Sequence, residues 1–229
     1  MRLAKILGGI WSVLLILACS VTPVTQAASE KNPVLREDTP YTVSKGDFNG
    51  TVPQFKRTND AVKEEAVQKI NAGFRNYLDT CYRDYKQDPD HKNYTIHISA
   101  QEKSIGNNLL SYAVYNSFYA KGAAHPVTAI EGFNFTLDKG ERTTWKQLIQ
   151  EQDLAAFSPA QITAALHNKQ ASDAGECSAS ASVTSEPDSY AFLVDEAGFI
   201  HILFQQYEVA PYAAGFITLN SGVRVTCAR

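Results

Sequence analysis

The sequence lacks the short motifs that mark the common catalytic and nucleotide-binding sites. It contains no GxSxG, no HExxH, no P-loop and no GxGxxG dinucleotide fingerprint. Its cysteines form no CxxC pair, which argues against a zinc knuckle and against a thioredoxin-like redox motif. We therefore expect no metal and no organic cofactor, and these absences favour a binding role over an enzymatic one.

Positive charge is also scarce. The chain has 21 Lys and Arg residues against 24 Asp and Glu residues. Removal of an N-terminal signal that contains Arg2 and Lys5 and no acidic residue would leave 19 basic residues and a net charge of −5. This balance argues against nucleic acid, and against an anionic membrane surface, as the main partner.

The N-terminus has the pattern of an export signal. Two basic residues precede an apolar run from Ile6 to Ala18, and residues 25–27 (TQA) form a small-residue cleavage site. We expect residues 1–27 to be removed and the mature protein to be exported to the cell envelope, either periplasmic or secreted. Cys19, in the run ILACS, offers an alternative as a lipobox cysteine. Its lipid would then be the only membrane attachment.

Three further cysteines remain, an odd number for an oxidising compartment. Cys81 falls on the apolar stripe of a predicted helix, where a free thiol packs as a small hydrophobic group. Cys177 and Cys227 fall in loop-like or terminal segments. We therefore predict a disulfide between Cys177 and Cys227.

The rest of the chain predicts one domain behind a tether. Residues 28–40 are polar and contain two prolines, as a tether would. The domain then spans 41–229, with two intertwined halves at about 41–120 and 121–229. Its length suffices for a sizeable hydrophobic core.

One long helix and several strands are expected within this domain. Apolar residues recur every three or four positions from Val62 to Tyr85, after a cap at Asn59 or Asp60. A hairpin turn is expected at Asn49-Gly50. Strand patterns cover 41–48, 51–55, 94–100, 109–119, 127–137, 190–194, 199–204, 216–219 and 223–226.

Short helices are expected between the strands. Thr144 and Gln147 form a capping-box pattern, and Ser158-Pro159 opens a helix that reaches about Lys169. Together the elements predict an α+β fold. Its largely antiparallel sheet would carry the long helix on one face.

The stretch YEVAPYAAG, residues 207–215, stands out as a candidate site. Pro211 cannot donate a ladder hydrogen bond, so strand pairing must end near it, and Gly215 permits a sharp turn. The neighbouring alanines would leave Tyr212 projecting alone, as binding hot spots often do. The alternative is that Tyr212 packs back on the core while the alanines allow close approach.

Two longer strings resemble a known family. The segment KGAAHPVTAIEGFNFTLDKGERTTWKQLI, and FLVDEAGFIHILFQQYEVAPYAAG after it, resemble the "GGAH … NFDL" and "YEIAPYAAG" motifs of RsiV-type anti-sigma factors and of the amino-terminal module of PdaC-type peptidoglycan deacetylases. The resemblance spans about Tyr41 to Val225. Ala123 replaces the second glycine of the first motif, and Phe135-Thr136 departs from its usual Phe-Asp.

The resemblance implies an exported α+β module that, in RsiV-type members, binds lysozyme. Only five residues precede the apolar run and the chain ends at Arg229, so we expect this module without a sigma-binding or deacetylase part. We expect a monomeric, non-catalytic protein that binds a lysozyme-like protein or a peptidoglycan component. The candidate binding residues are Gly122, His125, Tyr207, Glu208, Pro211, Tyr212 and Gly215.

Two other functions stay open from the sequence. One is a peptidoglycan-processing enzyme that uses Glu208 and His125 as an acid–base pair. The other is an accessory structural lipoprotein that scaffolds a partner. His125 is also expected to hydrogen-bond Glu208 or Tyr207 if the two loops meet.

Overall fold

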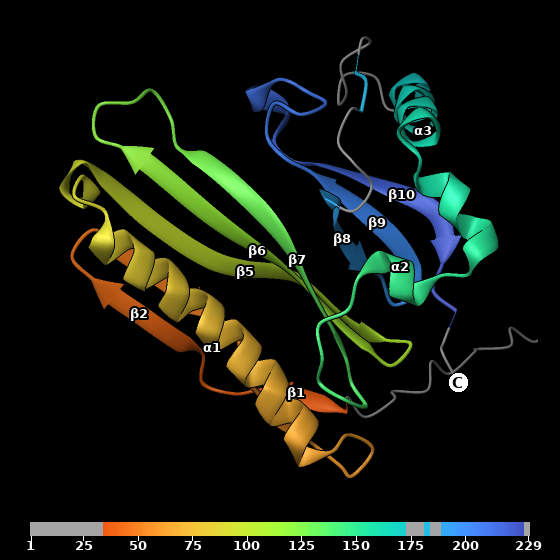
Figure 1. Cartoon of the computed structure of the whole chain (residues 1–229), viewed down its shortest axis with the longest axis horizontal. Coiled ribbons are helices and arrows are strands. Elements are labelled where there is room, and N and C mark those ends of the chain that lie inside the picture. Colours follow the sequence, from red (N-terminus) through yellow and green to blue (C-terminus); the bar gives the residue numbers. More distant parts are fainter. Residues whose placement is uncertain (1–33, 173–180, 184–188, 227–229) are drawn as a thin grey trace, which may run out of the picture. The chain divides into compact units, whose positions relative to one another are not determined.

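A five-stranded sheet forms the first layer of the fold (Figure 1). The computed structural model describes residues 34–172, 181–183 and 189–226. The strand order is β2-β3-β5-β6-β7, and every neighbouring pair is antiparallel except β3 and β5, which are parallel. Its strands are β2 (Tyr41–Lys45), β3 (Phe48–Val52), β5 (Tyr94–Gly106), β6 (Leu109–Ala120) and β7 (Val127–Thr136).

Several predictions fall on residues outside these ranges. They are the export signal, the lipobox cysteine Cys19, the first part of the tether and the proposed Cys177–Cys227 disulfide. Cys81 is a free, half-buried thiol that packs against the core.

The long helix α1 (Glu64–Gln87) packs on one face of this sheet, beside β2 and β3 (Figure 1). Ile70, Phe74 and Leu78 on its inner stripe are fully buried. Burial of these three side chains stabilises the folded state by several kcal/mol, because each buried side chain of this size contributes roughly 1.5–3 kcal/mol. The helix begins later than predicted, at Glu64, because the Asn59 side chain instead accepts a hydrogen bond from the Ala61 N–H in the preceding turn (2.9 Å).

The hairpin turn predicted at Asn49-Gly50 is wrong. The turn between β2 and β3 lies at Gly46-Asp47, and Gly46 has a φ of +60°. Gly50 lies inside β3, where an added Cβ would be 2.2 Å from Leu78 Cδ1. The glycine therefore allows the helix to approach the sheet closely and does not mark a turn.

A second, three-stranded sheet has the order β10-β9-β8. It consists of β8 (Ala191–Val194), β9 (Phe199–Phe204) and β10 (Ile217–Arg224), all antiparallel. Its core includes Trp145, Phe157 and Leu166 from the preceding helices. Those helices are α2 (Trp145–Leu148), the 3-10 helix η2 (Glu151–Phe157) and α3 (Pro159–Ser172). The predicted capping box is confirmed, since the Thr144 N–H donates to Gln147 Oε1 (2.9 Å).

Two short elements complete the first layer. The strands β1 (Leu35–Glu37) and β4 (Phe55–Arg57) pair with each other as a two-stranded sheet. The 3-10 helix η1 (His91–Asn93) connects α1 to β5.

The two larger sheets meet where β8 crosses β6 and β7. An added Cβ on Gly132 would lie 2.0 Å from the Phe192 carbonyl oxygen, so the backbones touch there. The buried amide of Asn134 donates to that same oxygen (2.8 Å), and the buried hydroxyl of Ser111 accepts from the Val194 N–H (3.1 Å). Two buried side chains thus satisfy backbone groups on the outer edge of β8.

The predicted fold class is confirmed. The fold is α+β, its sheets are largely antiparallel, a long helix covers one face, and short helices separate the strands. The strand β7, which was expected to open the second half of the domain, pairs along its whole length with β6 of the first.

Candidate functional site

Two loops that are far apart in sequence meet through three aromatic rings. The loop between β6 and β7 carries His125, and the loop between β9 and β10 carries Tyr207 and Tyr212. The His125 and Tyr212 rings stack with centroids 3.9 Å apart and an interplanar angle of 23°. Tyr207 lies beside them, with its ring centroid 5.7 Å from that of Tyr212. We call His125, Tyr207 and Tyr212 the aromatic trio.

Hydrogen bonds fix the tautomer of the histidine. His125 Nδ1 lies 3.0 Å from the Pro126 carbonyl oxygen, which can only accept a hydrogen bond. Nδ1 therefore donates, and in the neutral ring Nε2 accepts from the Tyr207 hydroxyl (3.1 Å). This contact confirms the expectation that His125 hydrogen-bonds Tyr207 if the loops meet.

Two glutamines hold the second loop against the outer edge of β7. The Gln205 side chain accepts from the Ile130 N–H (2.9 Å) and donates to the Ile130 carbonyl (2.8 Å). Gln206 Oε1 accepts from the Thr128 N–H (3.1 Å). The side-chain amides thus replace a neighbouring strand, which protects the edge and positions the residues that follow.

Glu208 closes the turn that presents Tyr207. Its carboxylate accepts from the Gln205 N–H (2.8 Å), and its own N–H donates to the Gln205 carbonyl (3.2 Å). This carboxylate therefore helps to build the turn, in agreement with a role as an acceptor for backbone N–H groups.

The expectation that Tyr212 projects alone is wrong. Tyr212 is half-buried beneath His125, and Tyr207 is the exposed ring, with 58% of its surface accessible. The reason is the short 3-10 helix η4 (Tyr212–Ala214), which follows Pro211 and folds the tyrosine back toward the first loop. Gly215 ends this turn at a φ of +72°, as predicted.

The remaining predicted residues lie around the trio. Pro211 is exposed, and Gly122 is exposed in the first loop with a φ of +90°. All seven predicted site residues therefore belong to the two loops that meet. Sequence reasoning missed the two glutamines that hold the loops together, because no local pattern marks a side chain that will cap a distant strand.

The surface beside the trio is apolar and nearly free of charge. Val127 is 57% exposed and Phe118, its cross-strand partner, is 39% exposed. Residues 122–130 contain no Lys, Arg, Asp or Glu, and residues 205–219 contain only Glu208. Aromatic residues without charged neighbours are typical of the core of a protein interface.

Tyr207 is held in a strained backbone conformation. Its φ is +68°, in the left-handed region that residues other than glycine rarely adopt. Such strain costs about 1–3 kcal/mol and tends to occur where a side chain must be presented for function.

Replacing Tyr207 by glycine should therefore leave the free energy of unfolding within about 1 kcal/mol of its original value. Glycine removes the strain, while the substitution loses one exposed ring and one hydrogen bond. Chemical denaturation with urea measures this difference, and Tyr212→Ala is the matched comparison in the same loop. A loss of more than about 2 kcal/mol in Tyr207→Gly would show that the ring serves stability.

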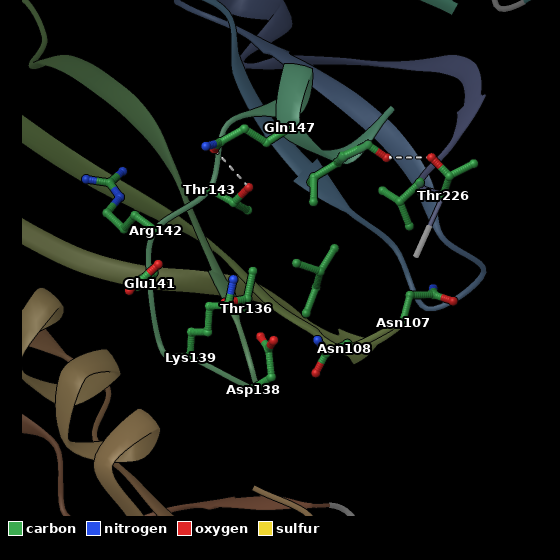
Figure 2. A pocket seen from close by; sticks show the side chains of 13 residues that line it. Asn107, Asn108, Thr136, Asp138, Lys139, Glu141, Arg142, Thr143, Gln147 and Thr226 are labelled. Carbon is green, nitrogen blue, oxygen red and sulfur yellow. Dashed lines mark hydrogen bonds between the residues drawn. The ribbon is translucent and has the colours of Figure 1, made fainter. Parts of the chain in front are cut away.

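Two hollows lie away from the trio, on either side of the segment that leads into α2. The first, of about 220 Å³, is lined mainly by polar and charged side chains, among them Asp138, Lys139 and Glu141 (Figure 2). The pKa of Asp138 is lowered: desolvation acts to raise it, but nearby polar groups of Thr136, Asn108 and the Lys139 N–H favour the charged carboxylate and outweigh that effect. The second hollow, of about 380 Å³, lies along the outer edge of β7.

Within 34–172, 181–183 and 189–226, no group of three or more His, Cys, Asp or Glu side chains is placed to hold a metal ion. No helix in that part of the chain is long and apolar enough to span a bilayer.

Part of the second half of the chain is similar to a known protein family. Residues 146–220 match the model of DUF3298, a protein family of unknown function, and no curated protein matches the chain in sequence. A DUF3298 family member from Bacteroides fragilis NCTC 9343 shares 16% identity with a TM-score of 0.51, covering 82% of this chain and 90% of its own. A DUF3298 family protein from Pseudomonas aeruginosa PAO1 shares 12% identity with a TM-score of 0.51, covering 81% and 88%.

These two structures establish a shared fold. The matched region contains Tyr207 and Tyr212. It begins at residue 146 and therefore does not include His125. Residues 146–220 of the chain are therefore similar to the DUF3298 family, and the chain as a whole shares the fold of the two solved members.

Proposed function

We propose that the surface around the aromatic trio binds a protein, and that the chain is an exported, non-catalytic module of the cell envelope. The observation that carries this proposal is Tyr207, an exposed aromatic ring on a strained turn, in a loop whose only charged side chain is Glu208. A rigid aromatic side chain loses little conformational entropy on binding, so it suits a hot spot.

The partner we propose is a lysozyme-like protein. The resemblance to RsiV-type proteins suggests this class, and the negative charge of the mature chain favours encounter with a basic enzyme. Because that attraction acts between exposed charges, added salt should slow association more than it weakens the formed complex.

A binding screen tests this function. The mature protein is titrated with lysozymes in a calorimeter, and in parallel it is incubated with peptidoglycan fragments that are then analysed by mass spectrometry. We expect saturable lysozyme binding and unchanged fragments. New fragment products would instead support an enzyme that uses Glu208 and His125. If the protein binds fragments but not lysozyme, the ligand is a peptidoglycan component and not the proposed protein partner.

A further inference from the structure

A different group of residues converges on the outer edge of β7, beyond the glutamines. The hollow of about 380 Å³ found there is lined by Glu131, Gly132, Arg142, Thr143 and, on the opposite wall, by Trp145, Tyr190 and Phe192. Its size lies within the range of small-molecule sites, which combine apolar walls with a few polar groups. Gln205 lines this hollow, but no member of the aromatic trio does, so the two sites are separate.

The guanidinium group of Arg142 is held in place at this hollow. One of its terminal N–H groups donates to the Gly132 carbonyl (2.9 Å), and its central carbon lies 4.0 Å from the centre of the Phe133 ring. Figure 2 shows the Arg142 side chain turned away from the first hollow. A planar cation that is already positioned loses little freedom when it binds a ligand.

This cation forms no direct ion pair in the part of the chain that the structure describes, although Glu131 lies near enough to act on it: burial lowers the pKa of Arg142, and the negative charge of Glu131 acts to raise it. No carboxylate there lies within 4.0 Å of the Arg142 guanidinium, and the Gly132 carbonyl takes one of its five N–H donors. An arginine with remaining donors and a fixed plane matches the two oxygens of a carboxylate.

The adjacent backbone adds a further donor. Both the N–H and the carbonyl of Ile130 point to the outer edge of β7, where Gln205 binds them. The alternation of an antiparallel ladder turns the Gly132 N–H in the same outward direction, two residues along. That N–H lies between Gln205 and Arg142, on the side of the strand that faces the hollow.

We propose that this hollow binds a small ligand through a carboxylate group, which pairs with Arg142 and the Gly132 N–H. The aromatic wall would hold a small apolar group of the same ligand. Glu131 also lines the hollow, so a ligand with one carboxylate and an amide fits better than a dianion. The C-terminal carboxylate of a short peptide and the lactyl carboxylate of a muramic acid residue share this chemistry. The site does not depend on the proposed function of the aromatic trio.

Nuclear magnetic resonance titration of the mature protein tests this site. The peptide probe is N-acetyl-alanyl-alanine, compared with its C-terminal amide. The sugar probe is N-acetylmuramic acid, compared with N-acetylglucosamine, which lacks the carboxylate. We expect at least one acid to shift the signals of Gly132, Arg142 and Thr143 in a saturable manner. Its uncharged counterpart should bind with an affinity at least about tenfold lower.

Variants of Arg142 provide the second arm. Arg142→Gln should weaken binding of the acid about tenfold or more, and Arg142→Lys should weaken it by a smaller factor because the charge remains. Arg224→Gln is the matched control, since its guanidinium carbon also lies over a ring, 4.4 Å from the centre of Phe199, outside the hollow. If the Arg142→Gln variant does not fold, the affinity of the Arg142→Lys variant for the acid is the deciding measurement.

Three results would overturn the proposal. The first is equal binding of an acid and its uncharged counterpart. The second is unchanged affinity in the folded Arg142 variants. The third is the absence of a saturable response to both acids.

Discussion

Replacing Gly132 by alanine is expected to destabilise the protein by about 3 kcal/mol, at the upper end of the usual cost of overpacking. The added methyl group would lie 2.0 Å from the Phe192 carbonyl oxygen and 2.9 Å from the Phe192 nitrogen. Both obstacles are backbone atoms of β8, so relief requires the second sheet to move away from the first. The buried hydrogen bond from Asn134 to the same carbonyl would be strained as well.

Thermal denaturation followed by circular dichroism measures this effect. For a domain of this size, about 3 kcal/mol corresponds to a decrease of roughly 6–12 °C in the unfolding midpoint. Gly50→Ala is the matched control, because its methyl group would meet the end of the flexible Leu78 side chain, at 2.2 Å. We expect Gly50→Ala to lower the unfolding midpoint clearly less than Gly132→Ala does. Equal midpoints for the original protein and Gly132→Ala would contradict the proposed contact between the sheets.

The second large effect concerns binding. Tyr207→Ala and Tyr212→Ala should each weaken the affinity for the lysozyme-like partner by about 30-fold or more, the equivalent of a hot spot of about 2 kcal/mol. The two substitutions act differently, because Tyr207 supplies the exposed ring and Tyr212 supports His125 from beneath. Their effects should therefore be less than additive when combined.

Calorimetric titration of the variants measures these affinities. Tyr41→Ala serves as the control, since Tyr41 is a half-buried tyrosine on β2, at the opposite edge of the five-stranded sheet. Its substitution should leave the affinity unchanged. A partner that binds all three variants with the same affinity as the original protein would place the binding surface elsewhere.

The sequence predicted the elements of the fold better than their ends and contacts. The long helix was predictable because its apolar stripe repeats over many residues, and the capping box at Thr144 because its two members lie close in sequence. The turn at Asn49-Gly50 was predicted wrongly. In the sequence, a glycine needed for close packing against Leu78 cannot be distinguished from a glycine needed for a turn. Only the packing of the helix on the strand distinguishes the two roles.

The candidate site was predictable as a set of loops and unpredictable in its detail. Pro211 and Gly215 mark the irregular end of a strand, and the family resemblance pointed to His125 in the other loop. Which tyrosine is exposed depends on η4 and on the stacking with His125, and the stacking is a contact between loops that lie far apart in the sequence. The position of Arg142 likewise depends on Phe133 and on the neighbouring edge of β7.

The central claim is that the aromatic trio is where the partner binds, and mapping the bound surface tests it most directly. Hydrogen exchange of the mature protein, with and without lysozyme, reports which backbone amides become protected. The account predicts protection concentrated in residues 121–126 and 205–216, the two loops that carry His125, Tyr207 and Tyr212. Protection confined to other parts of the described chain, with these loops unchanged in the saturated complex, would contradict it.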